Sequence, residues 1–209
     1  ATDNVNNVSA VVTSDGITTD FTGPQGTWAI DGDSSDIDRQ NFTDTYSGYW
    51  LHFIEEGSGF QTHEYALYDT NNSQYITPWT ATLDTFCVIN ELELIENQTY
   101  SLHIRGIDSV ANVGDILMSD GVLVDLSAPA VPVNLVGWFS TERIYLEWSH
   151  NAELDLNQYS IYGGTEMNPT TLLFNTADSL TEAFMPEFED GISCYLRITA
   201  TDIPGNESA

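Results

Sequence analysis

The sequence contains no lysine, and its only cationic side chains are four arginines, against 32 aspartate and glutamate residues. The formal net charge of −28 repels the phosphate backbone of nucleic acids, because such binding depends on Lys and Arg displacing counterions. The same shortage removes the polybasic segments that attach proteins to anionic lipid. We therefore expect no nucleic-acid partner and no electrostatic attachment to a membrane.

Long apolar runs and signal-peptide patterns are also missing. No run approaches the roughly 20 residues that cross a bilayer, so we expect no membrane insertion. Cysteine is scarce: Cys87 and Cys194 each lie in an apolar run of a separate predicted domain. Two such residues resemble neither a disulfide framework nor a metal knuckle, so we expect buried free thiols.

Motifs for catalysis are absent as well. The four histidines form no HExxH pair, and the sequence has no GxSxG elbow, phosphate loop or dinucleotide fingerprint. Carboxylate pairs that could serve glycoside hydrolysis are expected by coincidence where acids are this abundant. We predict that the chain is not an enzyme.

The composition does support a packed, strongly acidic protein. Apolar residues make up 41% of the chain and aromatic residues 11%, which is enough for a core. Acidity of this degree fits a saline or calcium-containing extracellular medium, where counterions screen self-repulsion; selection for solubility alone would explain it equally well.

An internal repeat organises the chain. Residues 1–24 resemble residues 106–129 without a gap, and residues 200–209 resemble residues 1–10. Acidic and turn residues recur 105 positions apart: Asp3 and Asp108, Asn7 and Asn112, Asp15 and Asp120, Asp20 and Asp125, Pro24 and Pro129. We expect that the chain starts partway through one repeat and stops partway through another, either because it is a segment of a longer array of repeats or because its own boundaries fall within the repeats.

The secondary-structure signal is almost wholly β. Short alternating runs rich in aromatic and β-branched residues are bounded by Gly, Asn, Asp or Pro at 45–53, 64–68, 99–105, 116–124, 143–148, 158–162 and 194–199. Only residues 91–96 and 152–156 could form a helical turn. Many short strands with frequent turns predict antiparallel β-sandwiches.

The predicted domains meet near residues 127–132, where two prolines interrupt the strand pattern. We expect a β-sandwich over residues 25–129 and a second over 130–209 that lacks its last strand. Residues 1–24 are predicted to be the terminal strand of a preceding repeat. Residues 11–20 either hang free or complete the open sheet of the second sandwich in a neighbouring copy, by donor-strand addition; the alternative is that they mark only an arbitrary fragment boundary.

These residues resemble bacterial fibronectin type III and related immunoglobulin-like tandem repeats. In the second unit, residues 146–148, 155–162 and 194–208 look like the B, C and F strands and the F–G turn. In the first unit the similarity rests on scattered positions, including Asp31-Gly32, Asp36, Asp38, Trp50, Trp79, Leu94, Tyr100, Asp108, Asn112, Asp120-Gly121, Asp125 and Pro129. One departure is that residues 109–112 lack the usual glycine of the F–G turn.

The resemblance implies a function without catalysis. Such repeats occur in large secreted or surface-anchored bacterial proteins, so we expect an extracellular spacer and adhesive stalk whose partners are other repeats. An alternative is a carbohydrate-binding accessory region of a secreted hydrolase, favoured if two of Trp28, Trp79 and Trp138 form an exposed row that contacts polysaccharide. A further alternative is a filament subunit assembled by donor-strand exchange.

Four aromatic residues are predicted to serve packing. Trp50 and Trp148 lie midway along alternating strands, where one ring can fill the space between sheets about 10 Å apart. Tyr100 and Tyr195 open the presumed F strands, the position of a tyrosine corner whose hydroxyl bonds to the backbone.

One acidic segment suggests a metal site. Asp31, Asp33, Asp36 and Asp38 place four carboxylates within eight residues, and hard oxygen ligands at alternating positions suit calcium. The spacing is not that of an EF-hand. The alternative is an acidic turn whose aspartates cap backbone amides.

Overall fold

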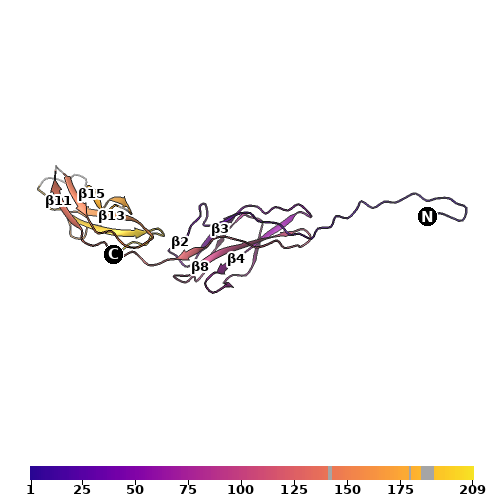
Figure 1. The fold of residues 1–209 in the computed structure, drawn as a ribbon, viewed down its shortest axis with the longest axis horizontal. Helices are drawn as coiled ribbons and strands as arrows, with labels where there is room; N and C mark the ends of the chain where they lie inside the picture. The colour runs from indigo at the N-terminus through magenta and orange to yellow at the C-terminus, as the bar shows by residue number, and fades with distance from the viewer. Residues whose placement is uncertain (141–142, 179, 185–190) are drawn as a thin grey trace.

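The computed structural model describes residues 1–140, 143–178, 180–184 and 191–209, and this part of the chain contains strands and turns but no helix. The strands form two β-sandwiches arranged in line, and the N-terminal segment extends away from the end of the first sandwich that lies opposite the second (Figure 1). The predicted all-β class is confirmed, and residues 91–96 and 152–156 do not form a helical turn.

The first sandwich has an antiparallel sheet in the order β1–β3–β7 and a larger sheet in the order β2–β10–β8–β4–β5. In the larger sheet β6 also pairs with β4, β9 also pairs with β8, and β2 runs parallel to β10. The strands are β1 (Ala29–Asp31), β2 (Arg39–Gln40), β3 (Tyr46–Trp50), β4 (Phe60–Asp69), β5 (Gln74–Tyr75), β6 (Thr80–Thr82), β7 (Phe86–Ile89), β8 (Thr99–Asp108), β9 (Leu117–Met118) and β10 (Val122–Val124).

Alternation along β3 fills the first core. Tyr46, Gly48 and Trp50 point inward and are buried, and Trp50 has no exposed surface. A Cβ on Gly48 would lie 2.5 Å from a methyl group of Leu102 in β8, so a larger residue here would force the packed Leu102 side chain to move. The predicted packing role of Trp50 is therefore confirmed.

The second sandwich has two three-stranded sheets, β11–β12–β15 and β14–β13–β16. Its strands are β11 (Val136–Ser140), β12 (Arg143–Glu147), β13 (Leu156–Gly164), β14 (Leu172–Ala177), β15 (Glu182–Phe184) and β16 (Tyr195–Asp202). Trp148, 3% exposed, packs with Tyr159 and Ile161 in its core, as predicted for this tryptophan. Among the described residues, β16 pairs with β13 on one side. On the other side residues 206–208 return along its end, through the bridge Thr201–Glu207, the bond from the N–H of Asp202 to the carbonyl of Asn206, the bond from Thr199 to Glu207 and the bonds between Ala200 and Ser208.

The tyrosine-corner prediction is right for one sandwich and wrong for the other. The hydroxyl of buried Tyr100 accepts a hydrogen bond from the backbone N–H of Ile95 at 3.1 Å. Tyr195 is 43% exposed instead. The strands β8 and β16 end in equivalent turns at Asp108 and Asp202. Eight residues before these aspartates lie Tyr100 and Cys194, so Cys194 is the equivalent of Tyr100. Tyr195 is one residue further along and therefore lies on the outer face of the strand.

Both cysteines are free thiols. Cys87 lies in the first core, where burial raises its pKa to about 12. Cys194 is only partly buried, which differs from the sequence expectation.

Candidate functional site

A hydrogen-bonded Asp–Asn turn occurs three times in the structure. In each copy the backbone N–H and side-chain amide of the asparagine donate to the two carboxylate oxygens of an aspartate four residues earlier, at 2.6–2.9 Å; the pairs are Asp3–Asn7, Asp108–Asn112 and Asp202–Asn206. The residue before the asparagine has positive φ in all three copies: 68° at Asn6, 69° at Ala111 and 98° at Gly205. The recurring residues found in the sequence therefore build one recurring turn.

In two of these turns the asparagine amide makes another bond, to the chain that enters the sandwich. Asn112 donates to the carbonyl of Asp20 at 3.3 Å, and Asn206 donates to the carbonyl of Asp125 at 2.9 Å. Asp20 and Asp125 are equivalent positions of the repeat. Each turn thus fixes the entering segment against its own sandwich.

Asp125 connects both sandwiches. Its N–H donates to the carbonyl of Gln40 in the first sandwich at 2.9 Å, and its carbonyl accepts from Asn206 of the second. Its carboxylate accepts from the guanidinium of Arg39 at 2.9 Å, and the same guanidinium nitrogen lies 3.1 Å from Asp155 of the second sandwich. Arg39 comes from β2, and Asp155 directly precedes β13. We call this group, Arg39, Asp125, Asp155 and Asn206, the joint.

The segment after Asp125 is bound to the second sandwich. Glu153 accepts from the N–H of Ala130 at 2.7 Å, and this bond holds the pKa of the carboxyl below its usual value. Asn151 donates its amide to the carbonyl of Ala130 at 2.7 Å and its backbone N–H to buried Tyr159 at 2.8 Å. The connection is therefore a hydrogen-bonded segment and not a free tether.

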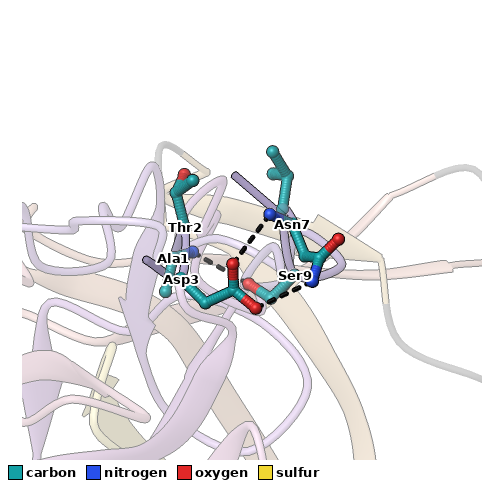
Figure 2. Close-up of a pocket in the computed structure, with 6 residues that line it drawn as sticks. Ala1, Thr2, Asp3, Asn7 and Ser9 are labelled. Carbon is teal, nitrogen blue, oxygen red and sulfur yellow. Dashed lines mark hydrogen bonds between the residues drawn. The ribbon is translucent and has the colours of Figure 1, made fainter. Parts of the chain in front are cut away.

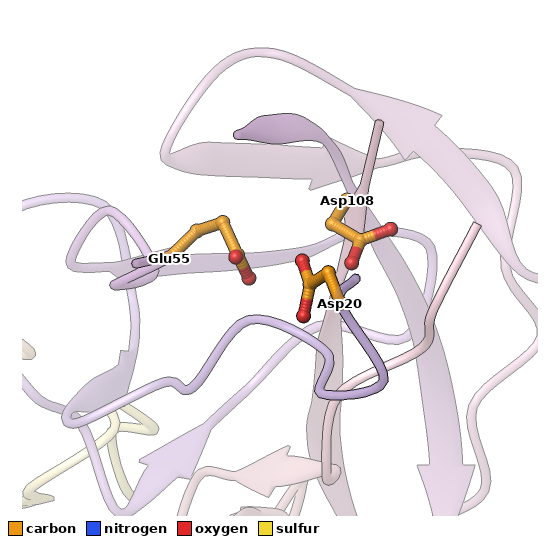
Figure 3. Close-up of side chains that lie close together, drawn as sticks. All are labelled: Asp20, Glu55 and Asp108. Carbon is orange, nitrogen blue, oxygen red and sulfur yellow. The ribbon is translucent and has the colours of Figure 1, made fainter. Parts of the chain in front are cut away.

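Three carboxylates converge at the outer end of the first sandwich, where the entering segment meets its turn. Asp20, Glu55 and Asp108 have oxygens within 4.8 Å of one another (Figure 3). Asp20 accepts from the N–H groups of Thr22 and Ser58, which lower its pKa to about 2. Both oxygens of Asp108 already accept bonds within its turn. Backbone donors therefore stabilise much of the negative charge here, as Arg39 does at Asp125.

The four predicted calcium ligands do not form one group. Among the described residues, Asp31 and Asp36 come together with Asp120, whereas Asp33 and Asp38 are exposed and outside this cluster. Both oxygens of Asp31 are engaged: one accepts from Tyr46 Oη, the other from the N–H of Gly121 at 2.8 Å.

The chemistry of Asp31 is that of a buried structural carboxyl. It has no exposed surface, and burial raises its pKa to about 6. Burial and the adjoining carboxyl also raise the pKa of Tyr46. Asp31 therefore connects β1 to β3 and to the turn before β10. This role corresponds to the alternative given to the calcium site, in which the aspartates of the segment cap backbone amides.

Three of the four histidines, His52, His63 and His103, lie against aromatic rings, whereas His150 is exposed. His63 is fully buried with Trp50, Phe53 and Phe60 around it, and burial lowers its pKa to about 4. A hollow of about 340 Å³ lies in the N-terminal hairpin and is lined by Asp3, Asn7 and their neighbours, with no histidine (Figure 2). Among the described residues, neither the surroundings of His63 nor this hollow contains a nucleophile with an adjacent base.

The three tryptophans proposed for sugar stacking do not form a row. Trp28, 43% exposed, contacts Tyr49 beside the β1–β3–β7 sheet, whereas Trp79 lies by the opposite sheet under the guanidinium of Arg105, 4.2 Å away. Trp138, 44% exposed, belongs to the second sandwich and stacks on Tyr145. Neither the exposed row nor the complete burial considered from the sequence is observed.

Arg39 and Asp155 of the joint are not among the residues that the sequence patterns predict to be functional. The recurrence of Asp20 as Asp125 pointed to this position, but Arg39 lies 86 residues before Asp125 and is not part of the repeated segment. The scarcity of cations was the remaining signal, since an arginine among so many acids is expected to bridge several of them.

Comparisons with known proteins identify the fold. No protein-family model and no curated protein matches the sequence. Among solved structures, the FN1–FN3 domains of chicken contactin (CNTN1) superpose with a TM-score of 0.57 and 12% identity, covering 100% of this chain and 70% of that one. A two-domain fibronectin type III segment of chicken tenascin gives 0.36 at 13% identity, covering 90% and 95%, and the twitchin kinase region of C. elegans gives 0.38 at 12%, covering 52% and 17%.

At these identities the similarity concerns the fold alone. The chain has a fibronectin type III-like, immunoglobulin-like β-sandwich fold, as the sequence resemblance implied. None of the described residues belongs to a helix long and apolar enough to cross a membrane.

Proposed function

Given a fibronectin type III-like fold, we propose that the chain is a non-enzymatic repeat module, a spacer and adhesive stalk of a large secreted or surface-anchored bacterial protein. The observation that supports this proposal most is the joint. Arg39 and Asp125 of one sandwich bind Asp155 and Asn206 of the next, so the relative orientation of the two units is specified by side chains. A spacer needs this property, whereas a flexible linker would suffice for independently acting domains.

The charge distribution fits an extracellular stalk. With 32 acidic and 4 basic residues, neighbouring copies repel one another at low ionic strength, and salt or divalent cations reduce that repulsion. Calcium is the proposed cation, with Asp36 and Asp120 beside Asp31 as candidate ligands. Because the oxygens of Asp31 already accept hydrogen bonds, we expect affinity in the weak range of extracellular calcium modules, about 0.1–1 mM.

Small-angle X-ray scattering of the full chain tests the spacer role. The scattering of the wild type should fit one elongated arrangement of the two sandwiches. The double variant Arg39→Gln, Asn206→Ala should need an ensemble of orientations, while Arg105→Gln, which removes an arginine paired with Glu64 outside the joint, should behave as wild type. A wild type that already requires a broad ensemble would contradict the proposal.

A further inference from the structure

The outer face of the β1–β3–β7 sheet carries a row of apolar side chains. Residues along β3 alternate between buried and half-buried, so Tyr49 points away from the core. Ile30 of β1 and Phe86 of β7 both pair with Tyr49 and therefore lie beside it on this face. Val88 pairs with Ser47 and continues the face along β7. Three strands thus contribute to one apolar surface outside the first core.

The same face continues past the end of the sheet. The backbone N–H of Leu51 donates to the carbonyl of Trp28 at 3.1 Å, and the Trp28 ring meets the Tyr49 ring edge-on, with 6.1 Å between the ring centroids. Trp28, Leu51, Phe86 and Val88 are 43%, 46%, 54% and 50% exposed. Contiguous exposed apolar side chains of this kind mark interaction sites. We call this surface the apolar strip; it consists of Trp28, Ile30, Tyr49, Leu51, Phe86 and Val88.

The apolar strip is uncharged in a strongly acidic molecule. Asp84, which is exposed, precedes Phe86 by two residues and lies outside the strip. The net charge of −28 repels anionic partners and a second copy of the chain, whereas a cationic partner finds its complement among the 32 acidic residues elsewhere. The occupant that this surface fits is therefore an uncharged one.

Hydroxyl groups lie within and beside the strip. Tyr49 and Ser47 are half-buried neighbours on β3, and within the part of the chain that the structure describes neither hydroxyl bonds to another protein group. A purely apolar partner, such as a lipid tail, would bury these hydroxyls without hydrogen bonds, at a cost in free energy. Pyranose rings combine apolar C–H faces, which pack on aromatic rings, with hydroxyls that exchange hydrogen bonds with Tyr49 and Ser47.

We propose that the apolar strip binds an uncharged polysaccharide. This inference rests on the adhesive part of the proposed function and names the class of its target. The aromatic residues on the opposite sheet are already engaged with other side chains: Tyr75 shares a hydrogen bond with His103 at 3.1 Å, and Arg105 covers the ring of Trp79 while pairing with Glu64. Ligand contact is thus assigned to one sheet of the first sandwich.

Titration of the full-length wild type, followed by two-dimensional NMR, tests the site without any substitution. The probes are cellohexaose, mannohexaose and laminarihexaose at millimolar concentrations, with oligogalacturonate of the same length as the charged counterpart. We expect at least one neutral hexaose to shift the signals of Trp28, Tyr49 and Phe86 in a saturable manner. The acidic oligomer should bind at least tenfold more weakly, because the chain repels it.

Substitutions within the strip test which side chains hold the sugar. Trp28→Ala and Phe86→Ala should each weaken binding at least tenfold. Trp138→Ala is the matched control, since Trp138 is 44% exposed but belongs to the second sandwich, and its binding should equal that of the wild type. Neither Trp28 nor Phe86 is part of the first core, so melting temperatures should stay close to the wild-type value, and Phe86→Gln provides a polar alternative.

Several results would overturn the proposal. These are the absence of saturable shifts with all three neutral hexaoses, shifts centred on Trp79 or Trp138, or equal binding of oligogalacturonate. Shifts of the strip that depend on protein concentration without sugar would assign it to a second copy, and shifts with phosphatidylcholine vesicles alone would assign it to lipid. The scattering test of the joint uses no sugar, so a rigid wild type that binds no hexaose rejects this inference and not the spacer role.

Discussion

The three Asp–Asn turns allow one substitution to be compared in three settings. Replacing the asparagine by alanine removes a side-chain bond to the aspartate carboxylate and, in Asn112 and Asn206, the bond to the entering segment. Hydrogen bonds to charged groups contribute about 1.5–3 kcal/mol, and the paired carboxylates of Asp108 and Asp202 are 0% and 1% exposed. We therefore expect Asn112→Ala to lower the unfolding free energy of the first sandwich by about 2–3 kcal/mol, and Asn206→Ala that of the second by a similar amount.

Asn7→Ala is the internal control. Its turn has the same hydrogen bonds, but Asp3 and Asn7 are exposed and the hairpin contacts neither sandwich core, so the change should cost less than about 0.5 kcal/mol of either sandwich's stability.

Urea unfolding followed by two-dimensional NMR separates the sandwiches, and each variant should shift the midpoint of one only. About 2 kcal/mol corresponds to roughly 8–16 °C in melting temperature for a domain of this size. Equal losses in all three variants, or a loss below about 0.5 kcal/mol for Asn112→Ala, would refute the assignment of these turns as anchors for the entering segment.

Four other changes have distinct expected results. Because the folded pKa of Asp31, about 6, lies above its ordinary 3.8, its contribution to stability is present below pH 4 and lost by up to about 3 kcal/mol as pH rises to 6; Asp31→Asn should flatten that slope in pH-dependent urea titrations. His63 acts oppositely, because its folded pKa of about 4 lies below 6.5 and its contribution to stability is lost as pH falls through this interval. In His63→Phe the pH dependence of the unfolding free energy over this interval should therefore come mainly from Asp31. Ala111→Gly should raise the melting temperature of the first sandwich by stabilising it about 0.5–1 kcal/mol, because φ is 69° there and no change would mean that the turn is unstrained. Calcium should raise the melting temperature more than magnesium at equal ionic strength and EDTA should reverse it; equal responses would reduce the acidic clusters to screening.

Much of the fold could be predicted from local patterns. Alternation on β3 placed Trp50 inward, and the recurrence of Asp108, Asn112 and Asp125 marked the turn and the entering segment. These features act over short sequence distances, where side-chain spacing fixes which face each residue occupies. Tyr195 shows the limit of this reasoning: a one-residue error in register exchanges the inner and outer faces of a strand.

The candidate site depended on contacts that local patterns do not encode. Arg39 binds Asp125 and Asp155 because β2 lies beside β10 and the second sandwich follows directly, a juxtaposition that only the three-dimensional arrangement reveals. The aspartates near residue 31 were adjacent in sequence, yet Asp33 and Asp38 turn away while Asp120 arrives from 89 residues later. Adjacency in sequence was a poor guide to which carboxylates share space.

Residual dipolar couplings on the full chain test most directly whether the joint fixes the two sandwiches. One alignment tensor should fit the couplings of both units in the wild type, and Arg39→Gln, Asn206→Ala should separate them into two tensors of different magnitude. Two different tensors in the wild type would show units that reorient independently, which contradicts a spacer held by Arg39, Asp125, Asp155 and Asn206.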